Sequence, residues 1–365
     1  MVSFRVLIAG GGTGGHLFPG LAIAAALQRQ APGCGIRFVG SRHGIEHRIV
    51  PGQGYRLHRL AVRGLVGISW AARIPRLILL PWAFLQCLWI LLAYRPHLVI
   101  GVGGYASGPM VATALLLGRR CVLQEQNASP GLTNRMLGRW VKHAFLAVED
   151  RQGFFPRATV TGNPVRPEML ALREAGDSAP REGAPLLFVF GGSQGARVLN
   201  RAMTEALPRL AAWGRPLRIL HQTGAAELEA VRSAYAELPS EGPLQAEAAP
   251  FIDNMAEAYR EARLVVGRAG ASTVSEILAA RRAAVLVPIP GSSGNHQLRN
   301  AERLAEAGAA LVIEQARLTG DTLADTVLGL LADPARIEAM ENSTDTLFAG
   351  DAADAIARQC LDMMQ

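Results

Sequence analysis

The sequence predicts an α/β protein with two Rossmann-like, parallel-sheet domains that face each other across a cleft. Short apolar runs alternate with amphipathic stretches along the chain, which is typical of parallel sheets covered by helices. The chain has 365 residues, enough for about two domains. Residues 5–30 and 186–211 also share one pattern, namely an apolar strand, a glycine-rich turn and a helix. Each of the two segments is therefore expected to open a domain of its own.

The expected elements follow the chain in that alternating order. The apolar runs predict strands over residues 5–9, 36–39, 98–102, 122–124, 186–190, 217–220, 264–266 and 284–287. The amphipathic stretches predict helices over residues 17–30, 76–93, 197–212, 272–280 and 297–307. Because Asn163-Pro164 interrupts regular structure, we place the domains at residues 1–163 and 164–340. Residues 341–365 are predicted to form a C-terminal helix that packs back on the N-terminal domain.

Charge is distributed unevenly along the chain. Residues 1–124 contain thirteen arginines, no lysine and a single acid, Glu46, whereas the rest of the chain is mildly acidic. Such asymmetry indicates an anionic partner on the N-terminal side. Residues 77–93 form an uncharged apolar run that predicts a membrane span, a buried helix or a helix with a membrane-facing edge. The apolar run beside the arginines favours a membrane over nucleic acid.

The motifs argue against metal and nicotinamide chemistry. The sequence contains no H-E-x-x-H and no EF-hand loop, so we expect no dedicated metal site and no cofactor. A dinucleotide site also needs an acid after the second strand. That strand runs into Gly40-Ser41-Arg42, which argues against NAD, although Arg42 would suit a 2′-phosphate.

Three glycine-containing turns follow expected strands. The first, residues 10–16, ends in His16, which is interpreted either as a general base or as a turn-capping, packed histidine. The second, residues 191–197, contains Ser193 and would cradle an anion or form a tight turn. The third, residues 268–276, is interpreted as a helix cap by Ser272 or Thr273, with Glu276 as its carboxylate, or as a site where Glu276 binds two vicinal hydroxyls.

Eight segments in this order resemble those of the MurG family. They read GGTGGHLFPGLAIA, GVGGYASGP, QEQNASPGLTNR, GNPVR, GGSQGARVLN, HQTG, RAGASTVSEI and HQLRNAERLAEAGAA. The resemblance implies a GT-B glycosyltransferase that moves N-acetylglucosamine from UDP-GlcNAc, with inversion, to the C4 hydroxyl of MurNAc in lipid I. The products would be lipid II of peptidoglycan and UDP. It also implies a peripheral enzyme at the cytoplasmic face of the bacterial inner membrane, where cell-wall synthesis proteins would be its partners.

The resemblance implies roles for single residues of this sequence. His16 would be the catalytic base, with Glu125 as the second choice. The residues implied to contact UDP-GlcNAc are Thr13, Gly14, Gly15, Asn127, Arg166, Ser193, Ile252, Ala271, Ser272, Thr273, Val274, Ser275, Glu276 and Gln297. Gln124 stands where some members of the family have His, and Asn295 stands where members often have Asp.

The acceptor is expected on the basic N-terminal domain. Tyr105 and Ser107, in a glycine-rich segment after a strand, are assigned to the acceptor side. We also hypothesise that Arg63, Arg73 and Arg76 rim an apolar patch that docks on anionic lipid and the lipid I pyrophosphate. Another GT-B UDP-sugar transferase, a UDP-GlcNAc 2-epimerase and a non-catalytic UDP-GlcNAc sensor remain as alternatives.

Overall fold

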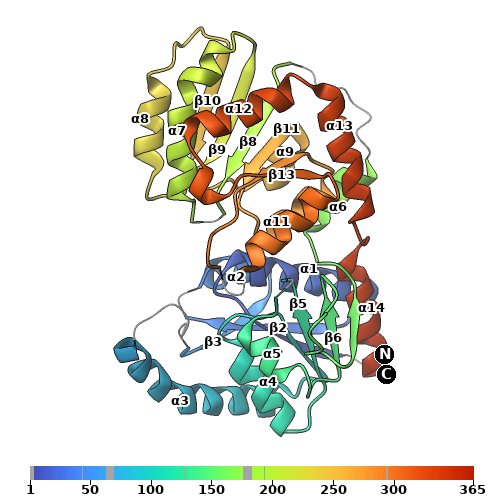
Figure 1. The fold of residues 1–365 in the computed structure, drawn as a ribbon. Coiled ribbons are helices and arrows are strands. Elements are labelled where there is room, and N and C mark those ends of the chain that lie inside the picture. The colour runs from blue at the N-terminus through green and yellow to red at the C-terminus, as the bar shows by residue number, and fades with distance from the viewer. Residues whose placement is uncertain are drawn as a thin grey trace. The chain divides into compact units, whose positions relative to one another are not determined.

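The computed structural model divides the chain into two compact units (Figure 1). It describes residues 4–42, 44–62, 70–127, 129–175, 183–192, 194–292 and 295–365, with the backbone alone for 70–78. The N-terminal unit comprises Met1–Arg166 and Ala349–Gln365, and the C-terminal unit comprises Pro167–Phe348. The chain therefore crosses from one unit to the other twice.

The N-terminal unit is built on a seven-stranded parallel sheet in the order β3-β2-β1-β4-β5-β6-β7. Its strands are β1 (Arg5–Ala9), β2 (Gly35–Ser41), β3 (Arg56–Leu60), β4 (Leu98–Gly101), β5 (Cys121–Glu125), β6 (His143–Leu146) and β7 (Ala158–Val160). The strand order reverses between β1 and β4. In open α/β sheets, ligands bind beyond the carboxyl ends of the strands at such a reversal.

Helices cover both faces of this sheet. One face packs against α1 (Gly14–Gln30), α2 (Glu46–Gly52) and the last helix, α14 (Ala352–Met364). The other packs against α3 (Trp70–Tyr94), α4 (Ser107–Leu116) and α5 (Leu132–Leu137). Arg29 of α1 donates to Asp354 of α14 at 2.6 Å, which joins the two ends of the chain. The predicted C-terminal helix thus begins at Ala352 rather than at residue 341, because α13 (Pro334–Ser343) ends first.

The C-terminal unit is also built on a parallel sheet, which has six strands in the order β10-β9-β8-β11-β12-β13. They are β8 (Leu186–Phe190), β9 (Leu217–Gln222), β10 (Leu244–Ala249), β11 (Ala262–Gly267), β12 (Ala284–Leu286) and β13 (Ala310–Val312). Its main apolar core lies under α7 (Arg197–Ala212), α8 (Leu228–Ala236), α12 (Gly320–Leu331) and α13. The remaining helices are α6 (Pro167–Glu174), α9 (Met255–Glu261), α10 (Ala271–Ala279) and α11 (His296–Glu306). The predicted pair of parallel sheets is confirmed.

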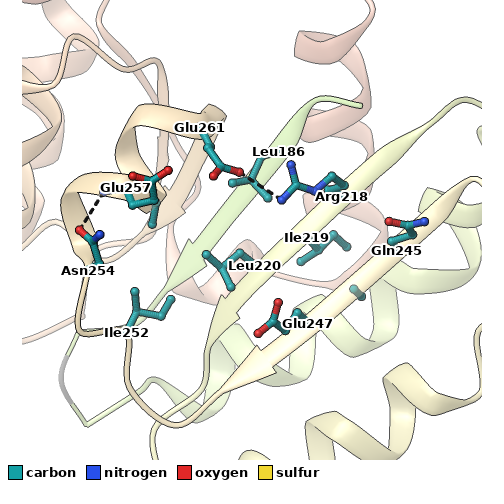
Figure 2. A pocket seen from close by; sticks show the side chains of 12 residues that line it. Leu186, Arg218, Ile219, Leu220, Gln245, Glu247, Ile252, Asn254, Glu257 and Glu261 are labelled. Atoms are coloured by element: carbon teal, nitrogen blue, oxygen red, sulfur yellow. Dashed lines mark hydrogen bonds and ion pairs between the residues drawn. The ribbon is translucent and has the colours of Figure 1, made fainter. Parts of the chain in front are cut away.

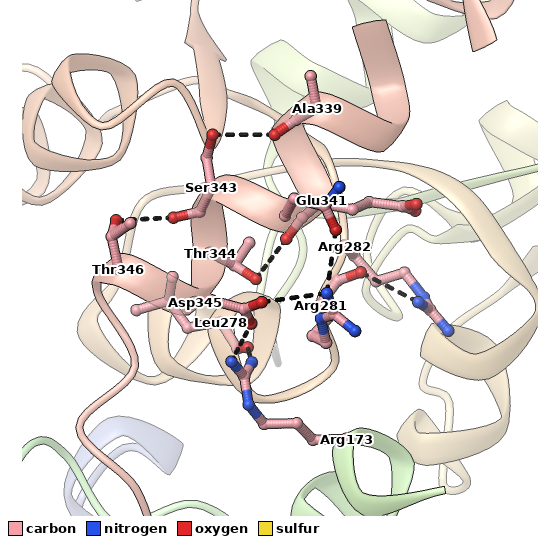
Figure 3. A network of polar contacts seen from close by, with 11 residues as sticks. Arg173, Leu278, Arg281, Arg282, Ala339, Glu341, Ser343, Thr344, Asp345 and Thr346 are labelled. Atoms are coloured by element: carbon pink, nitrogen blue, oxygen red, sulfur yellow. Dashed lines mark hydrogen bonds and ion pairs between the residues drawn. The ribbon is translucent and has the colours of Figure 1, made fainter. Parts of the chain in front are cut away.

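One polar network ties together the segments by which the chain enters and leaves the C-terminal unit (Figure 3). Arg173, on α6 just after the entry, donates to the Leu278 carbonyl at 2.8 Å and to the Asp345 carboxylate. Its guanidinium also lies 4.0 Å from the ring centre of Phe348, the last residue before the exit. Arg281 binds the same carboxylate at 3.1 Å. The two connections are thus anchored at one place.

Helix α3 contains the apolar run of residues 77–93. Its inner face is buried in the core beside α4, through residues such as Ala83, Cys87 and Leu91. Its outer face exposes large apolar side chains, namely Leu79, Trp82, Phe84, Leu85, Trp89 and Leu92. None of the helices in the described part of the chain has the length and hydropathy of a membrane-spanning segment.

Candidate active site

The first glycine loop, between β1 and α1, is shaped by a buried carboxylate. Glu46 is 1% exposed, and it accepts hydrogen bonds from the Gly12 N–H at 2.8 Å and the Ser41 N–H at 2.7 Å. A Cβ atom on Gly11 or Gly40 would lie 2.6 or 2.5 Å from the Glu46 side chain. Glycine is therefore required at both positions. The sequence motifs predict no role for Glu46, although its isolation among arginines was a usable signal.

The loop after β4 approaches this first loop closely. Gly103 and Gly104 have φ of +89° and +79°, a conformation that glycine adopts at little cost. A Cβ atom on Gly104 would lie 2.2 Å from the Gly11 carbonyl oxygen, and one on Gly103 would lie 2.6 Å from His16 Nδ1. These two glycines let the loops that follow β1 and β4 meet at the point where the strand order reverses.

His16 lies in the first turn of α1, which follows the carboxyl end of β1, next to the point where the strand order reverses. Thr13 is the N-cap position, so the backbone of α1 begins before the histidine. The half-buried ring places Nδ1 3.1 Å from the Val102 carbonyl oxygen, and the side-chain amide of Gln126 contacts the same nitrogen. The imidazole is thus held by groups that follow β4 and β5.

Glu125, at the end of β5, is 2% exposed, and both carboxylate oxygens accept hydrogen bonds. Oε1 accepts from the backbone and side-chain amides of Asn127, and Oε2 accepts from the Gly131 N–H and the Asn134 side chain. Four donors therefore surround one buried carboxylate. This arrangement fits a residue that shapes the loop around Asn127 better than one that takes a proton from a substrate.

The two acceptor-side residues differ in access. Tyr105 is 45% exposed, and its ring lies over Gly12. Ser107 is fully buried against β4, where a Cβ atom on Gly101 would lie 2.7 Å from its hydroxyl, so its side chain does not face solvent.

Arg166, a predicted contact of the donor nucleotide, stacks on Phe18 of α1, with its guanidinium 5.0 Å from the ring centre.

Four predicted residues cannot be placed by their side chains. Arg63 and Ser193 lie outside the described residues, and so do the side chains of Arg73 and Arg76 on α3. Their roles remain predictions. Thr13 is exposed, and Gly14 and Gly15 form the start of α1.

The second glycine loop, after β8, packs on the HQTG segment after β9. A Cβ atom on Gly195 would lie 1.8 Å from the Thr223 carbonyl oxygen, so the two backbones are in contact. Gln222 donates to the Gly192 carbonyl at 2.9 Å and accepts from the Ile252 N–H at 2.8 Å. Gln222 thus connects the glycine loop to the predicted uracil contact, a link that spacing in the sequence did not show.

A buried histidine supports the same segment. His221 Nε2 lies 3.1 Å from Asn200 Oδ1, and Nδ1 lies 2.8 Å from the Tyr235 hydroxyl. Asn200 also donates to the Thr223 carbonyl at 2.9 Å. Burial lowers the pKa of His221 to about 4, so the ring is neutral at physiological pH.

The third turn opens α10, whose N-cap is Gly270 without a side-chain hydrogen bond. The interpretation of Ser272 or Thr273 as a helix cap is therefore wrong, since α10 already begins at Ala271. The Ser272 hydroxyl is buried, and no described group bonds to it. Glu276 is 7% exposed and accepts from the Tyr259 hydroxyl at 3.4 Å.

The remaining residues of this turn extend α10. Val274 is buried, and the Ser275 hydroxyl donates to the Ala271 carbonyl at 2.8 Å. Thr273 is half-buried. Gln297, at the start of α11, accepts from the Ile289 N–H at 3.1 Å. The turn thus combines a helix N-terminus, a buried hydroxyl and a carboxylate, which suits a phosphate beside a diol.

Arg268 supports this turn, although the motifs predict no role for it. Its buried guanidinium donates to the Val287 carbonyl at 3.0 Å and to Gln315 Oε1 at 2.9 Å. Burial lowers the pKa of the guanidinium. Asn300 of α11 donates to the neighbouring Ala269 carbonyl at 3.1 Å. Both residues hold the turn that precedes α10.

A pocket of about 340 Å³ lies in the C-terminal unit between α9 and the exposed face of β9 and β10 (Figure 2). Arg218 and Glu261 form an ion pair at 3.1 Å on one side of it. Ile252 is the one predicted site residue that lines it, among those the structure describes. The pocket therefore does not include the predicted nucleotide-binding turn, residues 268–276.

Comparisons with known proteins agree with these motifs. Residues 6–146 match the N-terminal domain of glycosyltransferase family 28, and residues 186–356 match its C-terminal domain. A Myxococcus xanthus protein is 44% identical over 99% of this chain and 93% of its own length. A Syntrophotalea carbinolica protein is 46% identical over 98% of both chains. Both are named UDP-N-acetylglucosamine--N-acetylmuramyl-(pentapeptide) pyrophosphoryl-undecaprenol N-acetylglucosamine transferase.

Solved structures share the fold. The crystal structure of Acinetobacter baumannii MurG matches with a TM-score of 0.78 and 30% identity, and covers 98% of this chain and 99% of that one. A putative UDP-N-acetylglucosamine 2-epimerase from Listeria monocytogenes matches with a TM-score of 0.69 at 12% identity, which shows the fold alone. The GT-B fold class and the resemblance found in the motifs are confirmed. The chain belongs to glycosyltransferase family 28.

Proposed function

We propose that this enzyme transfers N-acetylglucosamine from UDP-GlcNAc to the C4 hydroxyl of MurNAc in lipid I, producing lipid II and UDP. The names of relatives that are 44–46% identical over nearly the whole chain support this substrate pair. The observation that carries the mechanism is the imidazole of His16, held where the strand order of the N-terminal sheet reverses.

The C-terminal unit would bind the nucleotide of the donor. The N-terminus of α10 would present its backbone amides to a phosphate oxygen, and Glu276 would accept hydrogen bonds from the ribose hydroxyls. Ile252 would contact the uracil through its backbone. Ser193, Gln297 and Asn127 would bind the diphosphate and the sugar, as their motifs imply.

Bond making and bond breaking would occur at the anomeric carbon of the donor. His16 accepts the proton of the acceptor hydroxyl, whose oxygen forms the new bond on the face opposite to UDP. The bond to the UDP oxygen breaks, and UDP leaves with the electron pair. Amide dipoles at helix N-termini and the guanidinium of Arg166 would stabilise the negative charge that develops on the diphosphate.

Glu125 would support this chemistry without transferring the proton itself. Its four hydrogen bonds orient Asn127 and the loop up to Gly131. Removing a proton from the acceptor would require a carboxylate oxygen to give up one of these bonds. We therefore assign the base to His16 and the positioning of Asn127 to Glu125.

The membrane face of the enzyme would be the outer surface of α3. It exposes two tryptophans, Trp82 and Trp89, that are 55% and 67% accessible. The stretch that contains this helix is rich in arginine and lacks acids between residues 47 and 124. Apolar side chains beside basic ones suit an anionic bilayer surface. We propose that this surface docks at the cytoplasmic face of the inner membrane, where lipid I is presented.

The test is UDP release measured with UDP-GlcNAc and a lipid I analogue, with UDP-GalNAc as the donor control. Release that requires both UDP-GlcNAc and the acceptor supports the proposal. Release without an acceptor would indicate a hydrolase or an epimerase-like enzyme. Binding of UDP-GlcNAc without any release would indicate a sensor, and either result would overturn the transferase assignment.

A further inference from the structure

We propose that Gln126 is a positioning residue that acts with the Val102 carbonyl to fix which nitrogen of His16 carries the proton. The proton would lie on Nδ1, so that Nε2 offers its lone pair to the acceptor hydroxyl. This inference rests on the proposed role of His16 as the base and adds a second residue to it. None of the motif-based assignments gives Gln126 a role.

Three groups surround the Nδ1 atom of His16. The Val102 carbonyl oxygen lies 3.1 Å away, and the amide of Gln126 contacts the same nitrogen. On a third side lies the backbone of Gly103, where a Cβ atom would come within 2.6 Å of Nδ1. Val102 and Gln126 are 2% and 4% exposed. Nδ1 is therefore turned toward the protein interior.

The carbonyl of Val102 favours one tautomer of His16. A neutral imidazole carries one N–H, and a backbone carbonyl oxygen can only accept a hydrogen bond. A lone pair on Nδ1 would oppose the oxygen lone pairs across 3.1 Å, whereas an N–H on Nδ1 donates to them. The Nδ1–H tautomer is therefore favoured, and it leaves the lone pair on Nε2.

The amide of Gln126 reinforces this tautomer once its oxygen faces Nδ1. The structure places its NH₂ group there, and a rotation of 180° that preserves the shape of the side chain brings the oxygen to the same position. With the oxygen toward His16, both Val102 and Gln126 accept from Nδ1–H. As placed, the Gln126 amide oxygen is buried and has no described hydrogen-bond partner, and the rotation gives it one in Nδ1–H.

At the end of β5, the side chains of neighbouring residues point to different partners. Glu125 bonds to Asn127 and Asn134, whereas Gln126 contacts His16. One short segment thus supports the proposed base and a predicted donor-sugar contact through different side chains. Loss of the Gln126 amide should therefore lower kcat and leave the KM for UDP-GlcNAc nearly unchanged.

The experiment observes the tautomer directly. Long-range ¹H–¹⁵N NMR spectra of the full-length protein labelled with ¹⁵N-histidine distinguish a protonated from an unprotonated ring nitrogen. The chain has eight histidines, and His16→Asn identifies the signals of His16. We expect Nδ1 protonated and Nε2 unprotonated in the wild-type protein. A wild-type ring protonated on Nε2 would overturn the inference without any need for a variant.

Two substitutions of Gln126 and one matched control extend the test. Gln126→Leu should give a mixture of tautomers, and the isosteric Gln126→Glu should raise the titration midpoint of His16 by about 1 to 3 pH units, because a carboxylate favours the imidazolium. Gln124→Leu removes a buried side-chain amide from β5, two residues before Gln126. That amide donates to Asn163 at 3.0 Å. This control variant should leave the His16 signals as in the wild type, and equal changes in both leucine variants would overturn the inference.

The outcome is separate from that of the proposed function. If UDP release depends on the acceptor but His16 carries its proton on Nε2, the role of Gln126 is wrong and the transferase stands. If UDP is not released with UDP-GlcNAc and the lipid I analogue, the proposed function is wrong whichever nitrogen is protonated.

Discussion

Glu125 and Asn127 are joined twice, because one carboxylate oxygen accepts from the backbone N–H of Asn127 at 2.9 Å and from its side-chain amide at 3.1 Å. Glu125→Gln would place an NH₂ group against existing donors. We expect a loss of about 1–3 kcal/mol of unfolding free energy and a raised KM for UDP-GlcNAc. Urea unfolding and initial rates measure the two effects. Glu149→Gln, at an exposed site, is the control. An unchanged KM would contradict the proposed positioning of Asn127.

His16→Ala should reduce turnover far more than it reduces donor affinity. A general base contributes about 10²- to 10⁴-fold to the rate, so kcat should fall by that order while the KM for UDP-GlcNAc changes little. Initial rates over a range of UDP-GlcNAc concentrations separate the two constants. If both constants keep their wild-type values, the base lies elsewhere.

Gly104→Ala should destabilise the N-terminal unit. Its φ of +79° is strained for alanine, and the added methyl group would lie 2.2 Å from the Gly11 carbonyl oxygen. We expect a cost of about 2 kcal/mol or more and a displaced glycine loop. Gly52→Ala at the end of α2 meets no atom within 4 Å and serves as control. Equal denaturation midpoints for the two variants would show that the loops do not meet as described.

Stability should depend on pH through His221. Its pKa is lowered from 6.5 to about 4 by burial, so between these values the unfolded chain binds a proton that the native chain excludes. The free energy of unfolding is therefore unaffected by the titration of His221 above pH 6.5. It falls as the pH drops toward 4, by about 3 kcal/mol in total. Unfolding free energies at several pH values should fall less steeply in His221→Gln. Parallel curves for both proteins would exclude His221 as the titrating group.

Vesicle binding should depend on the exposed face of α3. Trp89→Ser removes an apolar side chain that is 67% exposed, and Val198→Ser makes a similar change on the C-terminal unit. We expect the first variant alone to bind less tightly to vesicles that contain anionic lipid. Salt should weaken wild-type binding, since each basic residue near the headgroups adds about 1 kcal/mol that salt screens. Binding insensitive to both lipid charge and ionic strength would refute the docking surface.

Much of the fold could be predicted because its central strands are apolar runs that lead into glycines. β1 and β8 have the predicted bounds, as does α7. Strands β3, β6, β7, β10 and β13 were missed, and they include both edge strands of each sheet. β6, β7 and β13 span only four, three and three residues. β3 reads RLHRL and β10 reads LQAEAA, because edge strands with one solvated face carry charge. Their sequences lack the continuous apolar run by which buried strands are recognised.

The motifs located the candidate site, but they did not show how its loops are held together. Glu46 is 34 residues from Gly12, and Gln126 is 110 residues from His16. Spacing along one chain gives no information about such pairs, because the strand order brings them together. One of the two interpretations of the third turn, a helix cap by Ser272 or Thr273, is wrong for a local reason, since Gly270 already provides the extended backbone that starts the helix.

The burial of Glu46 offers a way to measure how often the glycine loop opens. Glu46 is the one acidic residue among the first 124 residues, and its side chain lies beneath the loop at 1% exposure. A protease specific for acidic residues therefore has a single cleavage site in this third of the chain, and that site becomes accessible when the loop opens. The rate of that cut would measure, in the unmodified enzyme, how often the loop opens.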